Sequence, residues 1–99
     1  MPAELTLIWW RDIPAQVVAR RDRTTARAVL SDRFQEAIDA AATRAGLVGT
    51  DDYLNEWRRV SGPCDDDLDA VVAMEARRLE AAYPDERLES IIRSGGIAG

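Results

Sequence analysis

The sequence contains no histidine and no lysine, and its only cysteine is Cys64. Without histidine it lacks the usual general base, the commonest metal ligand and every Ser-His or Cys-His dyad. One cysteine cannot form an internal disulfide, and the aspartates that follow Cys64 raise the pKa of its thiol because they disfavour a further anion. The sequence therefore predicts no catalytic residue, no metal site and no cofactor.

Long hydrophobic runs, glycine-rich loops and an excess of positive charge are also missing. The apolar start, residues 5–10, is far shorter than the roughly 18 to 20 residues that cross a bilayer, and it follows an acidic residue rather than a basic region. The net charge is −5, the opposite of the balance that nucleic-acid binding requires, and neither common phosphate-loop pattern occurs. We therefore expect a cytoplasmic protein that binds neither membranes nor nucleic acid.

What is present indicates one folded domain that begins with a sheet. The chain has 99 residues, of which 46% are hydrophobic and 31% charged, which is ordinary globular usage. Alternating, branched and aromatic residues over 5–10, 16–20 and 24–30 predict three strands. Pro14 places a bend after the first of them. The pattern predicts a three-stranded antiparallel meander over about residues 4–30.

Helical patterns follow the predicted sheet. Ser31 or Asp32 can cap a helix that ends at Gly46, and Thr50 can cap a short second helix through Val60. A third helix is predicted from near residue 65 to the residue before Pro84, and a short fourth one over 85–93. The prediction is an α+β fold with three to four helices packed on the sheet, a single domain over residues 1–93, and a disordered tail over 94–99.

Two acidic features admit a structural and a functional interpretation. The aspartates around residues 65–69 resemble a hard-cation site, but their spacing does not fit an EF-hand and favours the start of a helix. Glu75 falls in the middle of an apolar helical face and needs a partner there. An ion pair with Arg78 or Arg11 is the favoured interpretation, and an acid with a raised pKa in a cleft is the alternative.

The tryptophans and arginines suggest possible binding surfaces. Trp9 is expected in the core, against Phe34 or Trp57, whereas Trp10 lies either on an open sheet face beside Arg11 or under the later helices. A second group of arginines on the predicted hairpin forms either an anion-binding patch or a solvated edge: Arg20, Arg21, Arg23 and Arg27.

Three segments resemble a known family. They are residues 8–17 (Ile8-Trp9-Trp10-Arg11-Asp12-Ile13-Pro14-Ala15-Gln16-Val17), residues 33–39 (Arg33-Phe34-Gln35-Glu36-Ala37-Ile38-Asp39) and residues 52–59 (Asp52-Tyr53-Leu54-Asn55-Glu56-Trp57-Arg58-Arg59). Together they resemble the small bacterial family labelled "virulence factor", over roughly residues 4–60. The label comes from longer proteins in which the module looks to be joined to HEAT-like repeats, without assigned chemistry. Short members look to occur beside genes of corrinoid- and folate-dependent methyl transfer, which implies an accessory role.

These observations favour a non-catalytic protein-interaction or accessory module with a protein partner. The predicted partner-binding residues are Trp10, Arg11, Asp12, Gln16 and Arg58. One alternative is a small-molecule or anion-binding accessory subunit that uses the hairpin arginines and that the resemblance links to corrinoid- and folate-dependent methyl transfer. The other is a homodimeric structural protein whose open sheet face is buried against a second copy.

Overall fold

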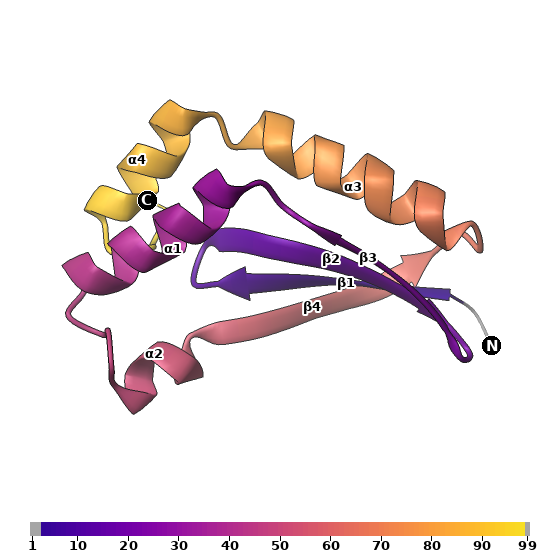
Figure 1. Cartoon of the computed structure of the whole chain (residues 1–99), viewed down its shortest axis with the longest axis horizontal. Helices are drawn as coiled ribbons and strands as arrows, with labels where there is room; N and C mark the ends of the chain where they lie inside the picture. The colour runs from indigo at the N-terminus through magenta and orange to yellow at the C-terminus, as the bar shows by residue number, and fades with distance from the viewer. Residues whose placement is uncertain (1–2, 99) are drawn as a thin grey trace.

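The computed structural model describes residues 3–98 as a sheet with helices on one side (Figure 1). The elements, in chain order, are β1 (Ala3–Trp10), β2 (Ile13–Arg21), β3 (Thr24–Val29), α1 (Asp32–Arg44), α2 (Asp51–Asn55), β4 (Trp57–Cys64), α3 (Leu68–Ala82) and α4 (Asp85–Arg93). The four strands form one antiparallel sheet in the order β3-β2-β1-β4. The predicted α+β fold is confirmed.

The first three strands form the predicted meander, joined by two-residue turns. Trp10 pairs with Ile13 and Arg21 pairs with Thr24, so each turn contains two residues. The first residue of each turn, Arg11 or Asp22, has a positive φ although neither is glycine. A left-handed residue with a side chain costs roughly 1 to 2 kcal/mol, so surrounding contacts must stabilise both turns.

Strand β4 replaces the second half of the predicted second helix. The helix α2 ends at Asn55, and from Trp57 the chain runs antiparallel to β1 with Trp57 opposite Trp10 and Cys64 opposite Ala3. The prediction of helix through Val60 was therefore wrong. Local spacing favoured a helix, but pairing with the free edge of β1 gives this segment backbone partners, and an edge strand tolerates Pro63.

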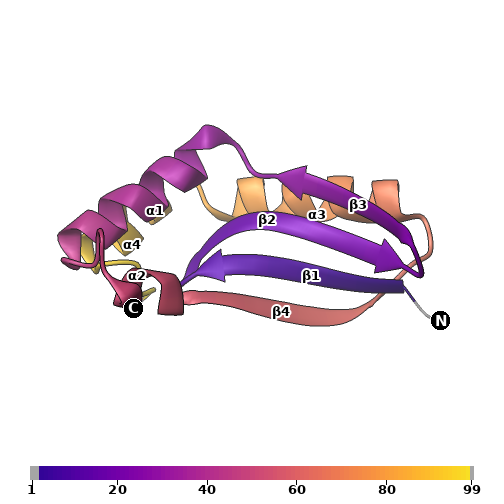
Figure 2. The same ribbon diagram turned by 60° about the horizontal axis from the view of Figure 1, so that its bottom comes forward.

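The helices cover one face of the sheet and leave the other open. α3 packs on β2 and β3, and α1 packs on β2 and on α4. Burial alternates accordingly: Val17 and Ala19 are fully buried beneath the helices, whereas Val18 is only partly buried and Arg20 is exposed. Figure 2 shows α3 behind the strands and α1 with α4 at the left end of the sheet, while the face turned to the viewer carries no helix along the strands.

Trp10 closes the end of the sheet where β1 meets α2. It is 0% exposed, its Nε1 donates to the Tyr53 carbonyl oxygen at 3.0 Å, and its ring lies 5.6 Å from that of Tyr53. The alternative that placed Trp10 on an open face is therefore wrong, because α2 and the chain's last residues cover it. Trp9 lies partly buried on the helix side, edge-on to Tyr83, which in turn contacts Phe34.

The residues after α4 pack against the turn between β1 and β2. Gly95 and Gly96 are buried, both have a positive φ, and the Gly96 carbonyl accepts a hydrogen bond from the Asp12 amide at 2.9 Å. This placement of residues 94–98 differs from the disordered tail predicted for 94–99, while Gly99 lies outside the described residues. Glycine at position 96 permits the left-handed backbone and lets the chain come close to the Trp10 ring. The prediction did not include this packing against Trp10.

Substitution of Gly96 tests this packing. A Cβ there would lie 2.7 Å from the Trp10 ring, in a backbone conformation that disfavours side chains. We expect Gly96→Ala to lower the free energy of unfolding by about 3 kcal/mol, from left-handed strain and overpacking together.

Gly49→Ala is the matched control, because Gly49 also has a positive φ but its added Cβ would meet nothing within 4 Å. It should lose only about 1 kcal/mol, from backbone strain alone. Urea unfolding of both variants measures the difference, and equal losses would show that Trp10 is not held against Gly96.

Candidate functional site

Four of the five predicted partner-binding residues, Trp10, Arg11, Asp12 and Arg58, lie together at the turn between β1 and β2. Arg11 donates from Nη1 to the Gly95 carbonyl at 2.9 Å and from Nη2 to Glu56 at 3.2 Å, and its guanidinium lies 5.3 Å from the Trp10 ring. Its contacts therefore join the turn to α2's C-terminal end and to the residues after α4. Trp10 and Arg11 are held by the protein's own chain.

Asp12 and Arg58 complete the same arrangement. One Asp12 oxygen accepts from Arg58 at 3.3 Å, and the other accepts from the Ala98 amide at 2.7 Å. Arg58 also donates to the Arg11 carbonyl and lies 5.2 Å from the Trp9 ring. These contacts stabilise the left-handed turn and fasten β4 to it, so a structural role accounts for both side chains.

Gln16 lies elsewhere, on the uncovered face of the sheet, which we call the open face. Residues directly opposite in adjacent strands point to the same side. The register therefore defines the open face by Glu4, Thr6, Ile8, Gln16, Val18, Arg20, Thr25, Arg27, Val29, Trp57, Arg59, Ser61 and Pro63. Trp10, opposite Trp57, points to the same side but is covered there by α2 and Gly96. The open face contains three arginines and one carboxylate.

Most arginines elsewhere in the described residues bind groups of the protein itself, with Arg23 and Arg93 as exceptions, whereas the open face gathers three arginines without such partners. Among residues 3–98, no side-chain hydrogen bond or ion pair involves Arg20, Arg27 or Arg59. The predicted anion-binding group is thus divided: Arg20 and Arg27 lie on the open face, Arg23 is in the turn, and Arg21 pairs with Asp66 at 3.3 Å. Unpaired guanidinium groups keep all their donors for another molecule.

Apolar side chains and two shallow hollows lie among these arginines. Ile8 and Trp57 line a hollow of about 530 Å³ together with Gln16, Arg58 and Arg59, so two of the predicted partner-binding residues, Gln16 and Arg58, border it. A second hollow of about 240 Å³ runs between Val18, Arg20 and Arg59 and is lined also by Glu4, Thr6 and Ser61. An apolar centre with an arginine rim is typical of a surface that binds protein.

The predicted acidic features have structural roles. Glu75 forms an ion pair with Arg78, which confirms the favoured interpretation, whereas Arg11 pairs with Glu56. Asp67 caps α3 by accepting from the Ala70 amide. Within residues 3–98, no cluster of three acidic or cysteine residues has the arrangement of a metal site.

Cys64 lies beside Glu75 in an open groove of about 760 Å³ between β4 and α3. Burial raises the pKa of its thiol, and the charges of Asp65, Asp66 and Glu4 raise it further. The thiolate is the nucleophilic form of cysteine, so this environment opposes nucleophilic chemistry.

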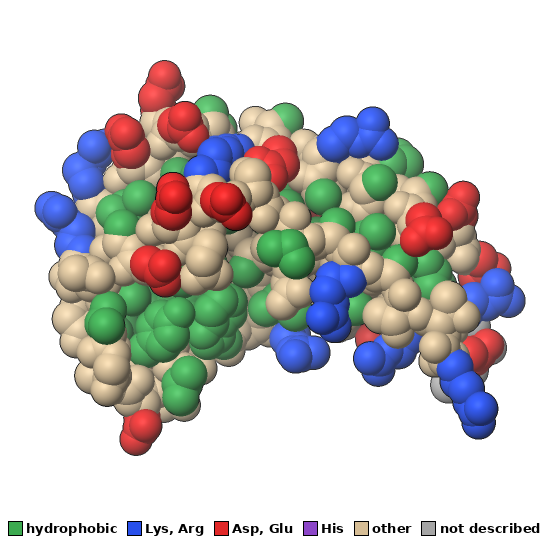
Figure 3. Space-filling view, in the orientation of Figure 1, with side chains coloured by type: hydrophobic (Ala, Val, Ile, Leu, Met, Phe, Trp, Pro, Cys, Tyr) green, Lys and Arg blue, Asp and Glu red, His purple; other side chains and the backbone are tan. Residues whose placement is uncertain are grey.

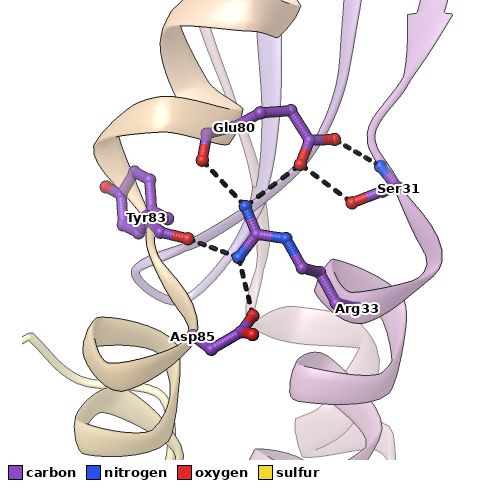
Figure 4. A network of polar contacts seen from close by, with 5 residues as sticks. All are labelled: Ser31, Arg33, Glu80, Tyr83 and Asp85. Carbon is purple, nitrogen blue, oxygen red and sulfur yellow. Dashed lines mark hydrogen bonds and ion pairs between the residues drawn. The ribbon is translucent and has the colours of Figure 1, made fainter.

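The densest polar network joins the start of α1 to the end of α3 (Figure 4). Arg33 donates to the carbonyl and carboxylate of Glu80 at 2.8 and 3.1 Å, to the Tyr83 carbonyl, and to Asp85 at 3.3 Å. Glu80 also accepts from the amide and hydroxyl of Ser31 at 2.7 and 2.8 Å. Because every charged group has a partner, this network holds the helices together rather than forming a reactive site.

Comparison with known families identifies this fold. The family described as "Virulence factor" matches residues 8–92. The chain belongs to this family, and the match extends beyond the segments on which the resemblance was based, through most of α4. No curated protein matches the chain. No solved structure matches it either.

Within the described chain, residues 3–98, no helix has the length and apolar character needed to cross a membrane. A cytoplasmic location stays a prediction.

Sequence reasoning missed Trp57 and Arg59 because it placed them in a helix. Residues 57–64 read W-R-R-V-S-G-P-C, in which apolar and polar residues do not alternate, so the sequence offered no periodic signal for this strand. The side chains at Leu54, Trp57 and Val60 fit helical spacing, so local sequence favoured a helix.

The Glu80 network predicts a pH dependence of stability. Burial would raise the pKa of Glu80, but hydrogen bonds from Ser31 and the nearby Arg33 outweigh it and lower the pKa. A depressed pKa in the folded state contributes stability that is present above the unfolded-state pKa of about 4.3 and is lost as the pH falls through the folded-state value.

We therefore expect the free energy of unfolding to fall as the pH is lowered from about 5 towards 3. Glu80→Gln should flatten this fall, while Glu89→Gln, at an exposed position on α4, should leave it as in the original protein. Urea unfolding at a series of pH values measures the free energy of unfolding of all three proteins. Parallel curves for Glu80→Gln and the original protein would contradict this role of Glu80.

Proposed function

We propose that the protein is a non-catalytic interaction module that binds an acidic surface of a protein partner through its open face. The observation that carries this proposal is the concentration of three arginines, Arg20, Arg27 and Arg59, on the uncovered face of a protein with net charge −5. None of the three has a side-chain partner among residues 3–98. Charge of one sign on one face favours a partner of the opposite sign and speeds the encounter.

The chemistry of the open face supports a protein surface as the ligand. Guanidinium groups bind carboxylates through paired hydrogen bonds, and they are less strongly hydrated than ammonium groups. Ile8, Val18 and Trp57 supply apolar area between them, with Ile8 9% exposed and the other two partly buried. The open face therefore combines an apolar centre with charges that select the partner.

The size of the open face indicates a modest or transient complex. Four strands about 4.8 Å apart and eight residues long cover roughly 500 Å² in projection. A standard interface buries about 800 Å² per partner. The partner is expected to bind with moderate affinity, or to extend its contacts to the edge of β4.

Charge also argues against the homodimer that buries the open face against a second copy. In a symmetric pair the same arginines approach each other, and the face contributes only Glu4 to offset them. Like charges brought together cost several kcal/mol. A different chain with an acidic surface avoids this repulsion.

The anion-binding accessory subunit is the alternative that uses some of the same residues. Arg20 and Arg27 would then bind phosphate or the carboxylates of a folate. A thermal-shift series with inorganic phosphate, nucleotides and folates separates the two proposals, because the interaction module predicts no specific stabilisation by any of them.

Charge reversal on the open face tests the interaction module. Arg27→Glu with Arg59→Glu should reduce recovery of the partner at least tenfold in affinity purification from the native host, because each change replaces attraction by repulsion. Recovery by the original protein should also fall as salt is raised.

The control is Arg77→Glu with Arg93→Glu, which changes the net charge equally at exposed positions on α3 and α4. Circular dichroism confirms that both double variants fold. Equal recovery by the two double variants would show that the open face is not the binding surface.

A further inference from the structure

A hydrophobic patch with acidic borders lies at the corner between α1 and α2, and it adjoins the open face where the ring of Tyr53 packs edge-on against that of Trp57 at 6.3 Å. Val48 is 61% exposed and Leu54 is 63% exposed, although both are large hydrophobic residues. Leu47 and Tyr53 beside them are partly buried. Figure 3 shows hydrophobic side chains gathered over the α1–α2 connection, with acidic side chains along the border.

The patch contains a hollow of about 300 Å³. Its lining is Asp39, Ala42 and Thr43 from α1, Val48 and Gly49 from the connection, and Tyr53 from α2. This volume is at the lower end of the 300 to 1,000 Å³ that small-molecule sites span, so it suits one long side chain better than a cofactor. Gly49 has a positive φ and leaves open space where a Cβ would lie.

The electrostatics of this corner favour a cation. Residues 32–56 contain six carboxylates and two arginines. Arg33 is occupied by Glu80 and Asp85, and Arg44 donates to the Arg93 carbonyl. Asp39 accepts one hydrogen bond, from Gln35 at 3.1 Å, and forms no ion pair within residues 3–98.

The raised pKa of the Tyr53 phenol agrees with a negative charge at Asp39 beside it. Burial raises the pKa of its phenol, and the carboxylate of Asp39 raises it further. The phenol ring and the carboxylate thus belong to one local environment, apolar on one side and negative on the other.

We propose that this hollow is a second docking site, for a basic and apolar segment of a partner protein. An arginine or lysine of that segment enters the hollow with its aliphatic stem against Val48 and Tyr53 and its charged group on Asp39. Apolar neighbours of that residue pack on Leu54. The hollow shares no lining residue with the hollows of the open face, although the two surfaces adjoin at Tyr53 and Trp57. The open face carries the opposite charge, and the docking site does not depend on the function proposed for that face.

The test is a titration of the isotope-labelled protein with two acetylated decapeptides, followed by nuclear magnetic resonance. One peptide alternates arginine with leucine, and the other alternates glutamate with leucine. The first should shift the amide signals of Asp39, Thr43, Val48, Gly49 and Tyr53, and the second should not.

Asp39→Asn should weaken binding of the arginine peptide about fivefold, the scale of one exposed ion pair. Val48→Ser should weaken it through lost apolar contact. Glu89→Gln, on the exposed surface of α4, is the matched charge control and should leave binding unchanged. All three positions are exposed, so the variants are expected to fold.

Three results of the peptide titration would overturn the proposal. They are shifts centred on other residues, equal binding of both peptides, and binding that Asp39→Asn leaves unchanged. Sedimentation of the protein alone should show a monomer. Self-association that Asp39→Asn abolishes would identify a second copy as the occupant and would also contradict the proposal.

Discussion

The burial of Trp10 at the end of β1 is the constraint on which most of the structure depends. Its ring contacts Tyr53 of α2 and lies directly against Gly96, so one side chain joins the first strand to segments 43 and 86 positions later. A buried tryptophan contributes the largest apolar area of any residue. The close approach of Gly96 shows why the residues after α4 take a defined path.

The turn after Trp10 determines how the arginines are divided between structure and surface. Arg11 and Arg58 are occupied by Glu56, Asp12 and nearby carbonyl groups, and they stabilise a left-handed residue at Arg11. In a chain without lysine, arginine serves as both the structural and the surface cation. Within residues 3–98 the open face is where three arginines without side-chain partners lie together, whereas Arg23 and Arg93 stand singly in a turn and on a helix.

Local sequence was sufficient for the elements whose pattern is unambiguous. The alternation in β1 and β2 predicted the meander, and the capped, amphipathic pattern after Leu30 predicted α1. The fourth strand was missed because Leu54, Trp57 and Val60 fit a helical period, and only pairing with β1 decides between the two structures. The position of Trp10 was left open for a similar reason, since residues distant in sequence bury it.

The candidate site was predicted in part. The prediction placed a partner-binding surface on the charged and aromatic residues around Trp10, but these residues contact one another and the C-terminal segment. Of the open face, the predictions contained Gln16, Arg20 and Arg27, while Trp57 and Arg59 required knowledge of β4. Which arginines are paired depends on tertiary contacts that no local pattern encodes.

The most direct test of the central claim is arginine-selective chemical labelling of the protein with and without its captured partner, read by mass spectrometry. The account predicts that the partner protects Arg20, Arg27 and Arg59 from labelling and leaves Arg77 and Arg93 as reactive as in the free protein. Protection of the helix arginines, with the open face still reactive, would contradict it.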